Sequence, residues 1–494
     1  MKARCVMVLG TTSGAGKSWL ATALCRWYAR RGLKVAPFKA QNMSNNARVV
    51  VGGEIGSAQY FQALAARAEP DVRMNPLLLK PEKDTHSQVV LLGQVDEELT
   101  RMDWRGRSGT VWPVIARCLD ELRAENDVVV IEGAGSPAEI NLRDCDIVNM
   151  RVAQHAQASC LLVSDIDRGG AFAHLYGTWS LLREAERRLI RGFVLNKFRG
   201  DASLLAPAPE VLREQTGIPV VATLPMWWQH GLPEEDGVFD DRSTSGGAVN
   251  ETIAVVAYPR TSNLDEFQPL KNLPGVRLVW ARSPADVAQA DCIVVPGSKH
   301  TSGDLAWLRA QGLDAAIARH AAAGGAVLGI CGGLQMLGEA LIDTHGIEEN
   351  GPGLGLLPLV TVFEPVKTVR RTQARFGAVS GTWAALSGVI MQGYEIHHGR
   401  TFQHPGMQAA RVAIPQGLGW QNQEGNVLGV YLHGMFEDAA VLHALFGATA
   451  PTLDSVFEGL ADFIGRHFRP AVIADLIRDP AGDNNNLDSG SSPE

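Results

Sequence analysis

The stretch GTTSGAGKSW, residues 10–19, indicates the architecture of the first half of this 494-residue chain. It follows the apolar run Val6–Leu9 and leads into a helical pattern, so we expect it to join a strand to a helix. Similar apolar runs recur and alternate with helical stretches, which is typical of a parallel sheet covered on both faces. The sequence therefore predicts an α/β fold. The predicted strands are Cys5–Leu9, Leu33–Phe38, Val128–Glu132, Cys160–Asp165, Gly192–Asn196 and Pro219–Leu224.

The turn itself has the composition of a phosphate-binding loop. It is rich in glycine and ends in Gly-Lys-Ser immediately before the helix. Backbone N–H groups of such a loop converge with the helix N-terminus on one point and favour an anion there. The strict motif begins with glycine where this chain has Thr11, and Gly10 lies one place earlier. We predict a variant loop that holds the phosphates of ATP. The predicted contacts are Thr12, Gly14, Gly16, Lys17 and Ser18.

Three further polar side chains are expected at the same edge of the sheet. Glu132, Asp165 and Asn196 each end a buried apolar run. Ligands of such sheets bind at the carboxyl ends of the strands. We predict that Ser18, Glu132 and Asp165 hold Mg²⁺, with Asp167 as an alternative to Asp165, and that Asn196 contacts the adenine edge of ATP.

A polar, glycine-rich stretch divides the chain. DDRSTSGGAVNE, residues 240–251, has no hydrophobic period and is predicted to be a linker. Strand patterns restart with TIAVVAYP, VRLVWA, DCIVVPG and GAVLGIC, which predict a second α/β unit with a mostly parallel sheet. The final stretch, DPAGDNNNLDSGSSPE, has too few apolar residues to be buried. We predict domains over 1–239 and 252–478, the second ending in a helix near 454–468, and a disordered tail over 479–494.

Composition excludes several classes of function. The net charge is −8 with no basic block, which argues against a nucleic-acid partner. No apolar run reaches the roughly 18–20 residues of a membrane span, and no signal-peptide pattern opens the chain. The seven cysteines are scattered without metal-site spacing. These features predict a cytoplasmic globular protein without a membrane partner and do not indicate its oligomeric state.

A second motif, GAVLGICGGLQMLG at residues 325–338, has the pattern of strand, sharp turn and helix. Glycines around Cys331 permit the strained turn that exposes a nucleophile, and the N-terminus of the following helix favours a thiolate. We predict Cys331 as the nucleophile, with the backbone N–H groups of Gly332 and Gly297 holding an oxyanion.

A nucleophilic thiol needs a base. His433 directly follows the apolar run LGVYL, whereas His397 and His398 lie in GYEIHHGRT. The position at the end of a strand favours His433 over the other two histidines.

These residues resemble known families. The second half resembles the class I glutamine amidotransferases, whose Gly-x-Cys-x-Gly-x-Gln motif corresponds here to residues 329–335. The first half resembles the dethiobiotin-synthetase-like P-loop enzymes in its early first glycine and its turn Glu132–Gly135. Both halves in this order, with FKAQNMSNNA, NPLLLKP, SDIDRGGAFA, NKFRGD and GYEIHHGRT, resemble the cobyric acid synthase family from about residue 4 to about residue 470.

The resemblance implies a cytoplasmic ligase of cobalamin biosynthesis. Such an enzyme uses glutamine and ATP–Mg²⁺ to amidate carboxylates b, d, e and g of a corrinoid, adenosylcobyrinic acid a,c-diamide. ATP would convert each carboxylate to an acyl phosphate, and the thiol would release ammonia from glutamine. Lys39 and Lys80 are hypothesised to meet the carboxylates of the corrinoid.

One departure from the amidotransferase pattern concerns the residue that supports the base. Most class I members carry Glu two residues after the histidine, and this chain has Met435 there. Glu437 and Asp438 lie nearby at other spacings. The resemblance therefore implies a dyad of Cys331 and His433, and we assign no third member.

Three alternatives stay open. A cobyrinic acid a,c-diamide synthase would have the same domains, but QNMSNNA and GYEIHHGRT favour the first interpretation. A dethiobiotin-type ligase with an inert second domain does not account for the turn at Cys331. A partition-type P-loop switch usually carries a signature lysine where this chain has Thr12.

Overall fold

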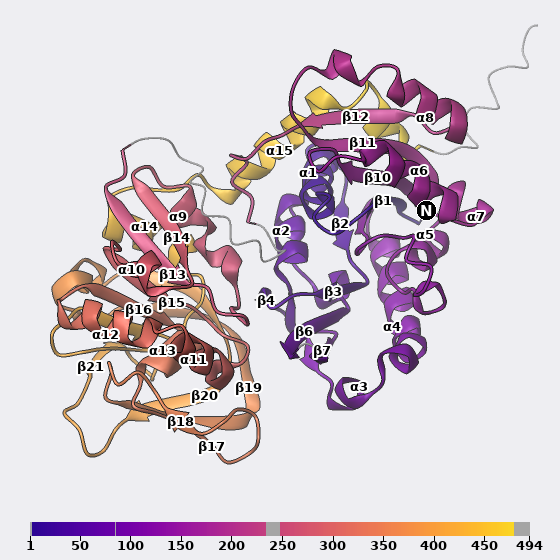
Figure 1. The fold of residues 1–494 in the computed structure, drawn as a ribbon. Helices are drawn as coiled ribbons and strands as arrows, with labels where there is room; N and C mark the ends of the chain where they lie inside the picture. Colours follow the sequence, from indigo (N-terminus) through magenta and orange to yellow (C-terminus); the bar gives the residue numbers. More distant parts are fainter. Residues whose placement is uncertain (1, 84, 234–247, 479–494) are drawn as a thin grey trace, which may run out of the picture.

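The computed structural model describes residues 2–83, 85–233 and 248–478, which form two lobes (Figure 1). The N-terminal lobe is built on a six-stranded, fully parallel sheet with the order β12-β11-β10-β1-β9-β2. Each strand predicted in the first half of the sequence is present, within a few residues of its predicted bounds. The strands are β1 (Arg4–Gly10), β2 (Val35–Phe38), β9 (Val128–Glu132), β10 (Ser159–Asp165), β11 (Ile190–Phe198) and β12 (Val220–Pro225).

Strand β1 shows how this sheet is covered. Val6 and Val8 belong to one apolar core, together with residues of the helix that follows the glycine-rich turn. Met7 and Leu9 point to the opposite face and belong to another core. Helices lie on both faces, so the predicted α/β architecture is confirmed (Figure 1). The helices are α1 (Lys17–Ala29), α2 (Ser57–Ala65), α3 (Glu97–Arg101), α4 (Trp104–Glu125), α5 (Met150–Ala156), α6 (Ala171–Leu181), α7 (Glu184–Arg187) and α8 (Ala208–Thr216).

Two small sheets extend the N-terminal lobe toward the other lobe (Figure 1). One has the order β3-β6-β7-β8, and the other is the antiparallel hairpin β4-β5. Their strands are short and carry many polar residues, so the sequence pattern did not predict them. The bounds are β3 (Gln41–Met43), β4 (Ala47–Val50), β5 (Gly53–Gly56), β6 (Leu77–Lys83), β7 (His86–Leu91) and β8 (Gln94–Val95).

The C-terminal lobe is a second α/β unit. Its seven-stranded sheet has the order β14-β13-β15-β16-β23-β22-β21, in which the first five strands are parallel and the last two are antiparallel. The mostly parallel sheet predicted for this half is therefore confirmed. The strands are β13 (Glu251–Val256), β14 (Val276–Ala281), β15 (Cys292–Val295), β16 (Ala326–Ile330), β21 (Arg411–Ile414), β22 (Gly419–Gln421) and β23 (Val427–Val430).

A four-stranded sheet with the order β18-β17-β19-β20 completes this lobe. Its two long antiparallel strands reach toward the N-terminal lobe (Figure 1). The strands are β17 (Ala340–Asp343), β18 (Gly351–Pro352), β19 (Leu359–Arg375) and β20 (Ile390–Gln403). The helices of the lobe are α9 (Gln268–Lys271), α10 (Pro284–Val287), α11 (Thr301–Ala310), α12 (Leu313–Ala322), α13 (Gly332–Leu337) and α14 (Ala439–Phe446).

The chain then returns to the N-terminal lobe through α15 (Leu453–His467) and α16 (Val472–Asp475) (Figure 1). Helix α15 packs against α1, and Arg26 of α1 forms an ion pair with Glu458 at 3.1 Å. The predicted C-terminal domain, 252–478, includes this helix, which packs on the N-terminal lobe. The apolar face of α15 shows that one side is buried but not which lobe buries it.

The remaining boundaries lie partly beyond the described part of the chain. Residues 240–247 of the predicted linker and the predicted tail, 479–494, fall outside it, and Glu251 at the end of the predicted linker begins β13. In the ranges that the structure describes, no helix is both long and apolar enough to cross a membrane.

Candidate active sites

The first candidate site is the turn between β1 and α1. Gly16 has a φ of 98°, in the left-handed region, and a Cβ atom there would lie 2.1 Å from the Asn196 side-chain nitrogen. That nitrogen donates a hydrogen bond to the carbonyl of Ala15 at 2.9 Å. Lys17 Nζ donates to the carbonyl of Thr12 at 3.0 Å. Glycine is therefore required at position 16. Asn196, which is predicted to contact the adenine edge of ATP, contacts the backbone of the loop.

Glu132, at the end of β9, lies in a buried network beside the loop. Its carboxylate accepts hydrogen bonds from Ser18 Oγ at 2.8 Å, Lys39 Nζ at 2.8 Å and the Gln62 side-chain amide at 2.6 Å. Burial would raise the pKa of Glu132, but Lys39 and the hydrogen bonds hold it below its ordinary value. The carboxylate is therefore ionised beside the Ser18 hydroxyl, and these hard oxygen donors suit Mg²⁺.

Asp165 reaches the same edge from β10, on the other side of β1 from β9. Its carboxylate lies 3.2 Å from Lys197 Nζ and 3.5 Å from Arg168 Nε. Lys197 also donates to the carbonyl of Gly14 at 2.8 Å. Asp165 is thereby linked to the glycine-rich loop through Lys197. Asp167, the alternative ligand, lies 2.7 Å from Arg199 Nε.

The second candidate site is the turn between β16 and α13. Cys331 has a φ of 52°, which only a strained turn imposes on a residue with a side chain. A Cβ atom on Gly333 would lie 1.8 Å from the carbonyl of Val295, and one on Gly332 would lie 2.8 Å from the Ser298 nitrogen. The glycines therefore allow the turn to pack tightly against the loop after β15, with Cys331 at its apex.

His433, three residues after the end of β23, lines the same small cavity as Cys331, whose sulfur lies 3.6 Å from the carbonyl of Ile396. A Cβ atom on Gly297 would lie 2.7 Å from His433 Cε1, so Gly297 lies directly against the imidazole. Cys331, His433 and Gly297 thus come together from three neighbouring strands, whose order is β15-β16-β23.

Glu266, in the 3-10 turn Leu264–Phe267, supports the histidine. One carboxylate oxygen lies 3.0 Å from His433 Nδ1, and the other accepts the Gly434 N–H at 2.9 Å. Glu266 and His433 are 167 residues apart and both buried. The sequence offered no local signal for this contact, because Glu266 neither ends a strand nor keeps the amidotransferase spacing.

The environment of His433 favours its protonated form. Burial lowers the pKa of the imidazole, but the Glu266 carboxylate and the Cys331 sulfur raise it to about 10. Near neutral pH the imidazole of His433 is therefore protonated.

The other residues considered for this site have different contacts. His397 stacks on Tyr431 and its Nδ1 lies 2.8 Å from the carbonyl of Gly399, whereas His398 Nδ1 lies 3.2 Å from the carbonyl of Glu364. Met435 is fully buried. Asp438 caps the N-terminus of α14, and Glu437 forms an ion pair with the N-terminal lobe.

A small cavity opens at Cys331 and is lined by both lobes. Gln335 and His433 line it from the C-terminal lobe, and Asn45 and Lys80 line it from the N-terminal lobe. Lys80 Nζ lies 2.7 Å from the buried carboxylate of Glu54, which Lys367 of the C-terminal lobe also contacts, at 2.5 Å. This contact does not support the hypothesis that Lys80 meets substrate carboxylates.

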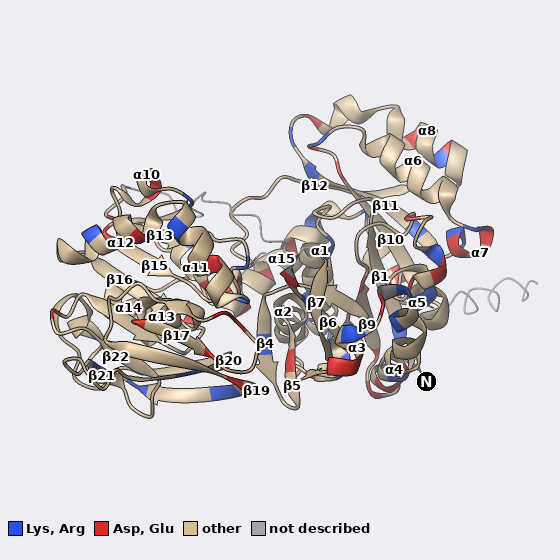
Figure 2. Ribbon diagram, turned by 60° about the horizontal axis from the view of Figure 1, so that its bottom comes forward, with Lys and Arg blue, Asp and Glu red and all other residues tan. Residues whose placement is uncertain are grey.

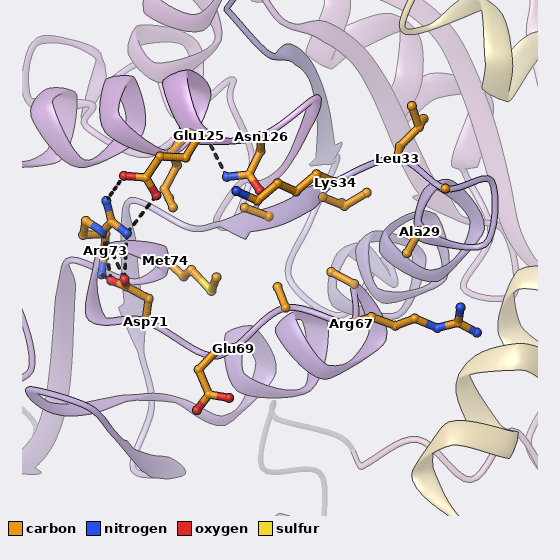
Figure 3. Close-up of a pocket in the computed structure, with 16 residues that line it drawn as sticks. Ala29, Leu33, Lys34, Arg67, Glu69, Asp71, Arg73, Met74, Glu125 and Asn126 are labelled. Atoms are coloured by element: carbon orange, nitrogen blue, oxygen red, sulfur yellow. Dashed lines mark hydrogen bonds and ion pairs between the residues drawn. The ribbon is translucent and has the colours of Figure 1, made fainter.

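A wider cavity of about 540 Å³ lies at the opposite edge of the first sheet (Figure 3). It is lined by Lys34, which precedes β2, and by Ala29 at the end of α1, far along both elements from the phosphate loop. Arg73 in its wall is paired with Asp71 and Glu125. We therefore do not assign the chemistry to this cavity.

Comparisons with known proteins match both lobes. Residues 6–233 match the CobQ/CobB/MinD/ParA nucleotide binding domain, and residues 252–441 match the CobB/CobQ-like glutamine amidotransferase domain. The cobyric acid synthase of Polaromonas naphthalenivorans (strain CJ2) is 75% identical over 484 residues, which cover 97% of this chain and 100% of the relative. That of Variovorax paradoxus (strain S110) is 77% identical over 478 residues, with coverage of 97% and 100%.

Proposed function

The chain belongs to the cobyric acid synthase family, and on that premise we propose that it amidates carboxylates b, d, e and g of adenosylcobyrinic acid a,c-diamide to give adenosylcobyric acid in cobalamin biosynthesis. The observation that carries this proposal is the presence in one chain of a phosphate loop beside Glu132 and a strained cysteine beside His433. The first site suits the activation of a carboxylate, and the second suits the release of ammonia from glutamine.

Activation takes place at the phosphate loop. A carboxylate is a poor electrophile, and transfer of the γ-phosphoryl group of ATP gives an acyl phosphate with a good leaving group. We assign the loop N–H groups and Lys17 to the ATP phosphates and place Asn196 behind the loop. Ser18 and Glu132 would hold Mg²⁺, which neutralises phosphate charge, with Asp165 nearby on β10.

The number of protein side chains near Ser18 and Glu132 bears on how Mg²⁺ would be held. Among residues 2–83, 85–233 and 248–478, no group of three or more His, Cys, Asp or Glu side chains is arranged to hold a metal ion. An Mg²⁺ ion at Ser18 and Glu132 would therefore need ATP phosphates and water as further ligands, which is how Mg²⁺ is usually held in nucleotide sites.

Ammonia production takes place at Cys331. The sulfur attacks the glutamine side-chain carbonyl while the N–H groups of Gly332 and Gly297 stabilise the oxyanion. The C–N bond breaks, and the leaving nitrogen takes a proton from His433 and departs as NH₃. Water, deprotonated by His433, then hydrolyses the thioester to glutamate and returns the thiol. Glu266 holds the imidazole in position throughout.

Both sites belong in one protein because each product is lost in bulk water. The acyl phosphate hydrolyses, and free ammonia is mostly protonated and therefore not nucleophilic near neutral pH. The cavity at Cys331 is lined by residues of both lobes, which supports delivery of NH₃ across the interface. The NH₃ then attacks the acyl phosphate and displaces phosphate.

The setting of the reaction follows from the same features. Seven free cysteines support a reducing compartment, so we propose that the enzyme acts in the cytoplasm on a small-molecule corrinoid, without a nucleic-acid partner.

The product identifies the activity. We expect the a,c-diamide incubated with ATP, Mg²⁺ and glutamine to gain four amides, at carboxylates b, d, e and g, as measured by mass spectrometry of the corrin. If the a,c-diamide is left unchanged and cobyrinic acid is amidated at a and c, the chain is a cobyrinic acid a,c-diamide synthase instead.

The metal assignment predicts the behaviour of Glu132→Gln. The amide keeps the size of the side chain but removes the charge next to Ser18, so we expect a fall of about 100-fold in kcat with a higher Mg²⁺ requirement. The measurement is ammonia-dependent amidation against Mg²⁺ concentration, which isolates this site from the thiol. An unchanged Mg²⁺ dependence would show that Glu132 has a structural role only.

The contact between Glu266 and His433 predicts a change in both rate and pH profile. In Glu266→Gln the carboxylate that raises the pKa of His433 is absent, so the imidazolium loses its proton at a lower pH than in the wild type. We expect the alkaline limb of glutamate release to move to lower pH and its rate to fall about 100-fold. Wild-type rate and profile in this variant would contradict the role of Glu266.

A further inference from the structure

The hairpin β4-β5 of the N-terminal lobe lies against the glutamine site of the C-terminal lobe. Figure 2 shows β4 and β5 beside the long strands β19 and β20, with charged residues of both signs on these strands. The hairpin follows the segment that begins at Lys39, whose ammonium group is bonded to Glu132 in the ATP site. A short stretch of chain therefore connects the ATP site with the surroundings of His433.

Arg48 on β4 is the buried charge at this contact. The residue is 2% exposed, and its guanidinium donates to both carboxylate oxygens of Glu437, at 2.8 and 2.5 Å. It also forms an ion pair with Asp265, the residue before Glu266. A planar guanidinium that holds two carboxylates fixes their relative position. Arg48 thus connects the two short 3-10 turns on either side of His433, Leu264–Phe267 and Met435–Glu437.

An aromatic ring, that of Tyr394, lies between Arg48 and the imidazole of His433. The guanidinium carbon of Arg48 is 5.1 Å from the centre of the Tyr394 ring. The Tyr394 ring stacks on the His433 ring, with centres 5.3 Å apart and planes at 22°. Tyr394 and His433 also exchange backbone hydrogen bonds at 3.2 and 2.9 Å. The order of groups is therefore guanidinium, phenol ring, imidazole.

Two neighbours of Arg48 bind the same loop. The Ala47 N–H donates to the side-chain oxygen of Asn263 at 3.0 Å, and the side-chain oxygen of Asn46 accepts the Leu264 N–H at 2.9 Å. The Glu266 N–H in turn donates to the Asn263 carbonyl at 3.1 Å. The turn that carries Glu266 is thus held by the N-terminal lobe at successive residues.

We propose that Arg48 of the N-terminal lobe is a positioning residue of the glutaminase site in the C-terminal lobe. It holds Asp265, Glu437 and Tyr394 so that Glu266 and His433 keep the geometry that serves Cys331. The inference rests on the proposed function of the Cys331 site and adds that this site is complete only with the hairpin of the other lobe in place.

The charges around His433 determine how the pH profile of glutamate release should change in the variants. The groups that face the imidazole are Glu266, Cys331 on the nucleophile turn and Tyr394 on β20. Behind them lie Asp265, Glu437 and Arg48. Arg48 is the positive group in this set. Removing a positive charge raises the pKa of a nearby titrating group, whereas removing the Glu266 carboxylate lowers the pKa of His433. The two substitutions should therefore move the pH profile in opposite directions.

The experiment uses the full-length protein and measures glutamate release and ammonia-dependent amidation side by side. For Arg48→Gln we expect kcat for glutamate release to fall about 100-fold, since small misplacements of catalytic groups have effects of this size. The KM for glutamine should change little, because Arg48 is not among the described residues that line the Cys331 cavity. Ammonia-dependent amidation should stay within about twofold, since the ATP site is untouched.

Two variants complete the design. Arg48→Lys keeps the charge without the two-pronged contact, so it should restore the wild-type pH profile while kcat stays low. Arg371→Gln is the matched control, because the Arg371 side chain also crosses the interface, to the Val49 carbonyl at 3.1 Å and to Glu69 at 3.5 Å, while only its backbone pairs with Tyr394. If Arg48→Gln does not fold, the kcat of Arg48→Lys decides the test.

The proposal is overturned if Arg48→Gln releases glutamate like Arg371→Gln, if its pH profile does not move upward, or if ammonia-dependent amidation falls by the same factor. A wild-type kcat in Arg48→Lys also overturns it. Failure of the proposed corrinoid function is seen separately, because it removes amidation in the wild type but leaves the comparison of glutamate release intact.

Discussion

Cys331→Ser is expected to lose glutamine-dependent amidation, on the order of 1,000-fold or more, and to keep ammonia-dependent amidation near the wild-type rate. A serine hydroxyl is nearly the same size as the thiol, so the turn is preserved, and so is the packing of Gly332 and Gly333 against the loop after β15. The hydroxyl is far less acidic than a thiol, so it keeps its proton and stays a weak nucleophile. Only the source of ammonia depends on this group.

The paired assay follows corrin mass and glutamate release with glutamine or with an ammonium salt. The rate with ammonium should rise with pH as more of it becomes NH₃. His433→Ala should behave like Cys331→Ser in both assays. Full glutamate release by Cys331→Ser would disprove the thiol mechanism, and loss of both activities would show that the two sites cannot be separated.

Lys17→Ala is expected to lose amidation with glutamine and with ammonia alike, on the order of 1,000-fold, because both routes need the acyl phosphate. Lys17 begins α1 directly after Gly16, where an ammonium group neutralises phosphate charge. The matched control is Lys34→Ala, an exposed lysine at the opposite edge of the same sheet. Wild-type amidation by Lys17→Ala with ammonium would show that activation does not occur at this loop.

The features that could be predicted from the sequence are those in which neighbouring residues act together. The phosphate loop and the turn at Cys331 are each a strand, a glycine-rich turn and a helix within about fifteen residues, so their patterns are local. Continuous apolar runs likewise predicted the parallel strands of both sheets, which the structure confirms.

The features that were missed depend on residues far apart in the chain. Glu266 meets His433 and Arg48 meets Glu437 only after the lobes have folded and docked. Neither contact has a periodicity or spacing to detect. The position of helix α15 was missed for the same reason. Its sequence pattern predicted a helix with a buried face, whereas its packing against α1 depends on the path of the whole chain.

In the proposed mechanism NH₃ passes from the C-terminal lobe to the N-terminal lobe, and an isotope experiment tests this transfer. The wild-type enzyme is given the a,c-diamide corrin, ATP, Mg²⁺ and glutamine labelled with heavy nitrogen in its amide, in the presence of unlabelled ammonium, and the corrin amides are analysed by mass spectrometry. Transfer within the protein predicts heavy nitrogen in the amides at b, d, e and g in place of the unlabelled pool. Amides that carry the isotope ratio of the bulk ammonium, or a corrin without new amides, would contradict the account.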